Sequence, residues 1–237
     1  VLDTSAQTGY NNSMEANTMA EEENLETNEE GVAEDKPQVI FLSNDSSDDD
    51  PKIRKTMLYG DLDETTAKDL IATMILLADT AEVQDLSDPN DPESELISRV
   101  RPFEMIISTG GGNADDMMSI YDMMRHIKQD VEIITTGIGK VMSAGTLLLA
   151  AGTKGKRRIG RNCRVMIHAV VGGSVGPMHE LTNEFKEIKK IQESYIQCLA
   201  DETNMTAQQI KRYLKQKTNV YLTAEEAVEL GLADEIF

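Results

Sequence analysis

Short apolar runs alternate with helix-like segments in the second half of the chain, and this alternation limits the possible folds more than any other feature. Strand-like runs occupy 103–108, 131–136 and 164–168. Helical spacing follows the first two, over about 114–128 and 143–149. Apolar strands of this kind are buried, and helices that join buried strands predict an α/β domain with right-handed crossovers.

The flanking segments extend the same pattern. A polar, acidic stretch at 80–99 contains two Asp-Pro turn signals, so we expect a surface loop there. We expect a long amphipathic helix over 178–201, where apolar residues recur at close to helical spacing. The remaining predicted elements are strands at 38–42 and 55–60 and helices at about 65–78, 206–216 and 224–230.

The negative charge is concentrated at the N-terminus. Residues 1–50 contain 14 Asp or Glu and one Lys, which is −13 of the total net charge of −19. Residues 1–36 are mostly polar and have Tyr10 as their single aromatic residue, so they cannot bury enough surface to offset chain ordering. We expect a disordered segment at 1–36, either a solvated acidic tail or a removable pro-segment or gate, followed by one domain at 37–237.

Composition also restricts the partners and the compartment. The net charge is −19 and binding to nucleic-acid phosphates needs Lys/Arg clusters, so we expect no nucleic-acid partner. No apolar run reaches the ~18 residues of a membrane-spanning helix, and no basic stretch precedes an apolar one as in a signal peptide. Cys163 and Cys198 lack metal-ligand or redox spacing, so we expect no metal or cofactor and a cytoplasmic location.

Three consecutive glycines lie between a predicted strand and a predicted helix, in Thr109–Asn113. Glycines allow the main chain to approach a ligand closely, and the N–H groups could bind a phosphate or a developing oxyanion. The spacing matches neither a dinucleotide-binding fingerprint nor a P-loop. A plain tight turn stays an equal alternative at this point.

Ser143 and His168 are the candidate catalytic pair. Ser143 precedes an apolar helix and has Gly145 two positions after it, which partly resembles a nucleophile elbow, although Val141 occupies the position of the usual small residue. His168 ends an apolar strand. Alone, each would be a helix cap or a structural histidine; together they suggest a serine nucleophile with an imidazole base.

Several segments, in this order, resemble the ClpP peptidase family, and the resemblance covers roughly 55–237. The segments are 119–131, 147–157, 165–168 and 223–234. The resemblance implies a ClpP/crotonase-like fold, a ββα-repeat core with a protruding handle helix at about 178–201. It also implies seven-membered rings that stack in pairs through the handles.

The same resemblance assigns the site residues. It implies Ser143 as the nucleophile, His168 as the general base, and the N–H groups of Gly112 and Ala144 as the oxyanion hole. Gly111, Gly172 and Gly173 fall where the family binds extended peptide by main-chain pairing.

Three departures from the family pattern are visible. Asn219 stands where the family has its catalytic Asp, and an uncharged amide stabilises an imidazolium less well than a carboxylate, so we expect slow or conditional hydrolysis. Glu104 and Ile106 replace tyrosines that help dock an AAA+ unfoldase, and Lys217 and Thr218 replace a ring-to-ring Asp/Arg contact. With the acidic tail and the 80–99 insertion, these departures suggest a divergent member, one that would act in a host cytoplasm if phage-encoded.

The leading hypothesis is therefore the ATP-independent core of a self-compartmentalised serine endopeptidase. It would act on unfolded chains or short peptides as a heptameric ring or a double-ring tetradecamer, with an AAA+ unfoldase as partner. A second hypothesis is a catalytically weak or silent subunit that scaffolds a mixed ring. A third is an acyl-CoA enzyme of crotonase type, which would not need Ser143 or His168.

Overall fold

The computed structural model describes residues 53–215 and 219–237. The segment 1–36 and the strand predicted at 38–42 lie outside these residues. The elements are β1 (Lys55–Leu62), α1 (Glu64–Asp79), β2 (Glu82–Leu86), β3 (Leu96–Val100), β4 (Phe103–Gly112), α2 (Ala114–Ile127), β5 (Ile133–Met142), α3 (Ala144–Ala150), β6 (Arg157–Ile159), β7 (Arg164–Ile167), α4 (Met178–Glu202), α5 (Ala207–Lys215), β8 (Val220–Leu222), α6 (Ala224–Glu229) and β9 (Glu235–Ile236).

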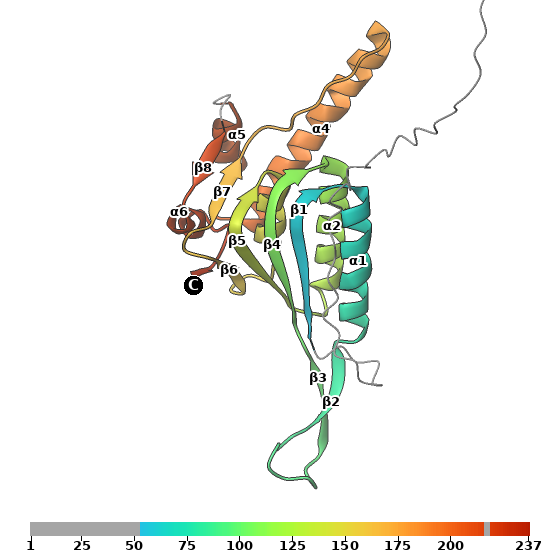
Figure 1. Cartoon of the computed structure of the whole chain (residues 1–237), viewed down its shortest axis with the longest axis vertical. Helices are drawn as coiled ribbons and strands as arrows, with labels where there is room; N and C mark the ends of the chain where they lie inside the picture. Colours follow the sequence, from blue (N-terminus) through green and yellow to red (C-terminus); the bar gives the residue numbers. More distant parts are fainter. Residues whose placement is uncertain (1–52, 216–218) are drawn as a thin grey trace, which may run out of the picture. The chain divides into compact units, whose positions relative to one another are not determined.

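The main sheet is almost entirely parallel and confirms the predicted α/β fold (Figure 1). Its strands follow the order β1-β4-β5-β6-β9, with every neighbouring pair parallel. Strand β5 has two successive partners on one side: residues 135–137 pair with β6, and residues 140–142 pair with β7. The sheet therefore divides along β5, and β8 adds to the β7 branch in antiparallel orientation.

Helices α1 and α2 pack side by side against β1 and β4 (Figure 1). They bury Leu70 and Met74 of α1 and Ile120 and Met124 of α2, which recur at helical spacing. The Asp63 side chain accepts a hydrogen bond from Thr66 N at 2.8 Å and so caps α1. By contrast, α3 is buried along its whole length, which explains its uniformly apolar sequence.

The predicted handle helix is confirmed as α4, which extends past the sheet (Figure 1). Its C-terminal half buries Tyr195, Ile196 and Leu199 against the core, whereas most of its N-terminal half is exposed, including Phe185. The apolar spacing that predicted the helix therefore marks a buried face over only half of its length.

The prediction of a surface loop at 80–99 is wrong in part. Strands β2 and β3 form an antiparallel hairpin that pairs Glu82 with Val100 and Leu86 with Leu96. The connecting segment contains the Asp-Pro signals and is held by Asp88 and Asp91, whose side chains accept hydrogen bonds from Asn90 N and Glu93 N. Strand β3 is exposed along its whole length and β2 is at most half-buried, so no alternation of apolar and polar residues identifies these strands.

Arg157 connects the C-terminal part of the chain to the core. Its guanidinium pairs with Asp234 at 2.5 Å and donates hydrogen bonds to the carbonyls of Ala150, Glu202 and Gly231. Burial would raise the pKa of Asp234, but hydrogen bonds and charge from Arg157 outweigh it and lower the pKa below its ordinary value of 3.8. One cation thus joins the C-terminal ends of α3 and α4 to the segment between α6 and β9.

We predict that Arg157→Met lowers the free energy of unfolding by about 3 kcal/mol, because it removes the buried cation that pairs with Asp234 and donates to three carbonyls. The loss should be largest above pH 4 and shrink as pH falls through the lowered pKa of Asp234, where the wild-type carboxylate is itself protonated. Urea denaturation at several pH values measures this.

Arg158→Met is the matched control, since Arg158 pairs with Glu235 at 2.7 Å with both side chains about half exposed. It should cost less than about 1 kcal/mol. Equal effects of the two substitutions would contradict the role assigned to Arg157.

Candidate active site

Ser143 lies in the turn between β5 and α3. Its φ is 55° and its ψ is −117°, and it is the one non-glycine residue with positive φ in 53–215 and 219–237. Such a conformation is costly for a residue with a Cβ and is found where the surroundings enforce it. Here Ser143 N donates to Met166 O at 2.8 Å, and Ser143 O accepts from Thr146 N at 3.0 Å. The turn presents the hydroxyl away from the helix, as in a nucleophile elbow.

His168 is brought to Ser143 by strand pairing. Strands β5 and β7 are parallel and pair Met142 with Met166, so the residues after each strand emerge at the same edge of the sheet. His168 Nε2 lies 2.7 Å from Ser143 Oγ. The two side chains that the sequence suggested as a pair are thus within hydrogen-bond distance, although they are 25 positions apart.

The His168 ring is partly buried, and burial lowers its pKa below the ordinary 6.5. The neutral imidazole is therefore the main form at neutral pH. For Nε2 to accept the Ser143 proton, the ring proton must be on Nδ1, and the lowered pKa keeps Nε2 unprotonated. A neutral ring at this distance can act as a general base.

The glycines of Thr109–Asn113 belong to the end of β4 rather than to a separate loop. Gly111 has φ +102°, and a Cβ there would lie 2.6 Å from Ser143 Cβ. A Cβ on Gly112 would lie 1.9 Å from Leu62 O. Both positions therefore exclude a side chain, because β4 passes so close to Ser143 and to β1.

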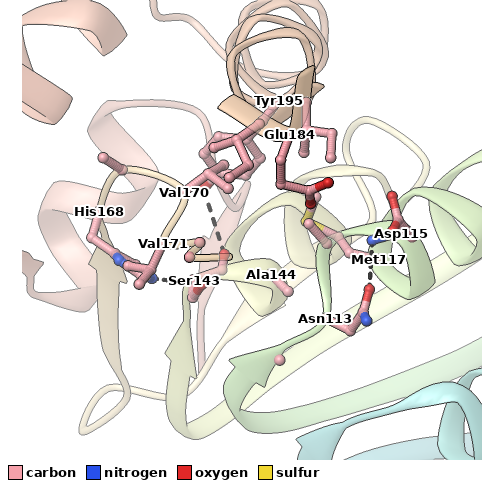
Figure 2. Close-up of a pocket in the computed structure, with 17 residues that line it drawn as sticks. Asn113, Asp115, Met117, Ser143, Ala144, His168, Val170, Val171, Glu184 and Tyr195 are labelled. Atoms are coloured by element: carbon pink, nitrogen blue, oxygen red, sulfur yellow. Dashed lines mark hydrogen bonds between the residues drawn. The ribbon is translucent and has the colours of Figure 1, made fainter. Parts of the chain in front are cut away.

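Ser143 and His168 open onto a cavity of about 310 Å³ between α2, α3, α4 and the segment after β7 (Figure 2). Its lining includes four residues predicted from the sequence besides this pair: Gly112, Ala144, Gly172 and Gly173. Ala144 is the first residue of α3, so its N–H has no partner within the helix. Gly111 is absent from the lining and instead packs against Ser143.

The backbone of Asn219 lies beside that of His168, because β8 pairs antiparallel with β7 and places Val220 opposite Ile167. Its amide nitrogen donates to Tyr221 Oη at 3.5 Å. Among the residues that the structure describes, no hydrogen bond joins Asn219 to His168. The structure brings the two residues near each other without joining their side chains.

Sequence reasoning missed most residues of the cavity wall, among them three with a phenolic or acidic side chain. Tyr195 was noted only for its helical spacing, yet its hydroxyl donates to Ser143 O at 3.4 Å. Asp115 and Glu184 also line the cavity, one from α2 and the other from α4. Acidic residues are so frequent in this chain that nothing in the sequence distinguishes these two.

Within the described ranges 53–215 and 219–237, none of the helices combines the length and the hydropathy of a membrane span. No group of three or more His, Cys, Asp or Glu side chains there is arranged to hold a metal ion.

Comparison with known proteins gives one consistent result. A sequence model of the Clp protease family matches residues 95–237. An ATP-dependent Clp protease proteolytic subunit 2 of Corynebacterium jeikeium is 33% identical over 185 residues, 78% of each chain. Proteolytic subunits 1 of Corynebacterium diphtheriae and Corynebacterium glutamicum are 34% and 33% identical over the same length, 78% of this chain and 78% and 79% of their own.

We predict that a fluorophosphonate labels Ser143 at a rate that falls in acid with a midpoint below pH 6.5, because protonation of His168 removes the acceptor for the serine proton and burial lowers that pKa. Mass spectrometry after labelling at graded pH measures the midpoint. His168→Gln should nearly abolish labelling, whereas His126→Gln, on the exposed side of α2, should not change it. A midpoint above 6.5 would contradict the neutral imidazole.

Proposed function

The chain belongs to the Clp protease family, and from this premise we propose that it is a serine endopeptidase core that cleaves peptide bonds through an acyl-enzyme. The observation that carries the proposal is the 2.7 Å contact between His168 Nε2 and Ser143 Oγ at the mouth of a cavity. The match to the Clp protease family model and to the Clp proteolytic subunits confirms the family expected from the sequence, and the roles of individual residues are what we propose.

In the first step, Ser143 Oγ attacks the carbonyl carbon of the scissile peptide bond while its proton moves to His168 Nε2. The carbonyl oxygen becomes an oxyanion, which the N–H groups of Gly112 and Ala144 stabilise. The backbone supports this role for Gly112: Asn113 N donates to Leu62 O on β1, and successive N–H groups of a strand point to opposite sides. The Gly112 N–H therefore points toward β5, on the Ser143 side.

In the second step, the C–N bond breaks and His168 gives its proton to the leaving amine. Water then attacks the acyl-enzyme, with His168 accepting a proton from water and returning one to Ser143 Oγ. No metal or cofactor takes part in this sequence. ATP use, named in the relatives, would belong to a separate AAA+ unfoldase.

Asn219 is the residue we propose to orient His168. With Nε2 as acceptor, the ring carries its proton on Nδ1, and the Asn219 carboxamide oxygen would accept it. The contact of its amide nitrogen with Tyr221 supports this arrangement, since it occupies the nitrogen and leaves the oxygen available. An amide supplies the hydrogen bond without the negative charge, so catalysis should be slower than with Asp.

The peptide would lie along Gly172 and Gly173, which line the cavity in an exposed, extended segment. A Cβ on Gly172 would be 2.7 Å from Ile188 Cδ1, so glycine lets this segment pass close to α4. We further propose a heptameric ring, single or paired through α4, in the cytoplasm. Unfolded polypeptides and short peptides would be its substrates.

A second candidate, a weak or silent subunit in a mixed ring, is favoured by Asn219 alone. The strained Ser143 backbone and the short contact to His168 favour activity, since a scaffold needs neither.

The direct test is turnover of a fluorogenic peptide by the assembled full-length chain. We expect Ser143→Ala to lower kcat/KM by about 10⁴-fold or more while assembly and far-UV circular dichroism stay unchanged. Absence of turnover, together with absence of fluorophosphonate labelling in an assembled ring, would reject the peptidase and favour the scaffold.

We predict that Asn219→Asp raises kcat by about tenfold or more, because a carboxylate stabilises the imidazolium formed in the first step. It should also move the acid limb of kcat/KM upward by about one pH unit, since a nearby negative charge raises the pKa of His168. Asn204→Asp, on the surface after α4, is the control and should change neither. A rise in rate without a shift of the acid limb would contradict the proposed contact with His168.

A further inference from the structure

The cavity beside Ser143 has two chemically different ends (Figure 2). His168 lies at one end, and Ser143 and Ala144 lie in the middle. At the other end are the carboxylates of Asp115 and Glu184, which come from α2 and α4. The acidic end therefore combines two elements that are distant in the sequence.

Neither carboxylate forms an ion pair with a Lys, Arg or His side chain among the residues that the structure describes. Their surroundings are also acidic. Burial, followed by the charges of Glu64, Asp63 and Asp115, raises the pKa of neighbouring Asp116. The negative potential at this end of the cavity is therefore the sum of several carboxylates, and a bound cation would relieve their mutual repulsion.

The wall of the cavity between Ser143 and the carboxylates is largely apolar, with Asn113 as a polar neighbour of Asp115. Its apolar part includes buried Met117 and, from α4, Ile188, Ile191 and Tyr195. A wall of this kind suits a long aliphatic stem that ends in a charged group, since Lys and Arg bury their methylene groups and keep the head polar. A purely apolar side chain would contact the apolar wall of the cavity but leave the two carboxylates without a cationic partner.

The direction of catalysis places one substrate residue at this end. His168 must reach the leaving amine, so the leaving part of the peptide lies toward His168. The residue whose carbonyl Ser143 attacks then projects its side chain to the opposite side, toward Met117, Asp115 and Glu184.

We propose that this chain prefers Lys or Arg at the residue that is acylated onto Ser143, with Asp115 and Glu184 as the specificity-determining carboxylates. The inference rests on the proposed peptidase function and adds its substrate class. Because both carboxylates are exposed, the preference should be moderate and should weaken as ionic strength rises.

The test compares fluorogenic peptides that differ only in the residue before the cleaved bond: Lys against norleucine, and Arg against citrulline. Each pair matches the stem and removes the charge. We expect kcat/KM to be about tenfold higher for the cationic member, which corresponds to about 1.4 kcal/mol. Asp115→Asn combined with Glu184→Gln should remove this ratio, whereas Glu187→Gln, whose residue pairs with Lys190 on the same helix outside the cavity, should preserve it.

Binding to Ser143→Ala keeps the inference testable without turnover. Fluorescence anisotropy should show the Lys peptide binding more tightly than the norleucine peptide, by a ratio that the double substitution removes. Equal kcat/KM values, or equal binding, for matched peptides would overturn the inference and leave the peptidase standing. Tighter binding of the Lys peptide with no turnover of any peptide by the wild type would retain the acidic pocket and instead reject the peptidase function.

Discussion

The parallel register of β4, β5 and β7 is the constraint on which the site depends. These strands pair Thr109 with Val141 and Met142 with Met166, so their carboxyl ends meet at one edge of the sheet. Gly111, Ser143 and His168 follow from that alignment, because each lies at or just after the end of its strand. A slip of one residue in the β5–β7 pairing would reverse the side-chain directions and separate Ser143 from His168, and a slip in the β4–β5 pairing would move Gly111 away from Ser143.

The strain at Ser143 is supported from three directions. Its N–H donates a hydrogen bond to the Met166 carbonyl of β7, and its own carbonyl accepts one from Tyr195 of α4. Gly111 of β4 allows the close approach of its side chain. Helix α4 therefore takes part in the turn that presents the nucleophile, in addition to forming a wall of the cavity.

The structure of this molecule can be predicted from the sequence in those regions where residues close together in the chain determine it. The helices α1, α2 and α4 follow from apolar spacing, and Ser143 and His168 follow from their places at the ends of apolar runs. The β2–β3 hairpin could not be recognised, because neither strand is fully buried on one face and the pattern carries no periodicity. The short strands β6, β8 and β9 have only two or three residues: β6 and β9 pair with each other near Arg157, and β8 pairs with β7, so each depends on tertiary neighbours. The contact of Tyr195 with Ser143 depends on tertiary packing over 52 positions, which no local pattern records.

The electrostatics of the proposed mechanism depend on two uncharged groups, the neutral His168 ring and the Asn219 amide. Burial already favours the neutral form of His168, and Asn219 adds a dipole where a carboxylate would add a charge. In the proposed mechanism both effects disfavour the imidazolium that forms when Ser143 attacks, so more of the transition-state stabilisation would come from the N–H groups of Gly112 and Ala144 and from substrate binding. The carboxylates of Asp115 and Glu184 lie at the opposite end of the cavity, and no charge interaction with them shifts the pKa of His168. A cationic substrate side chain would therefore supply binding energy without protonating the base, which allows recognition and proton transfer to be set by separate residues of one cavity.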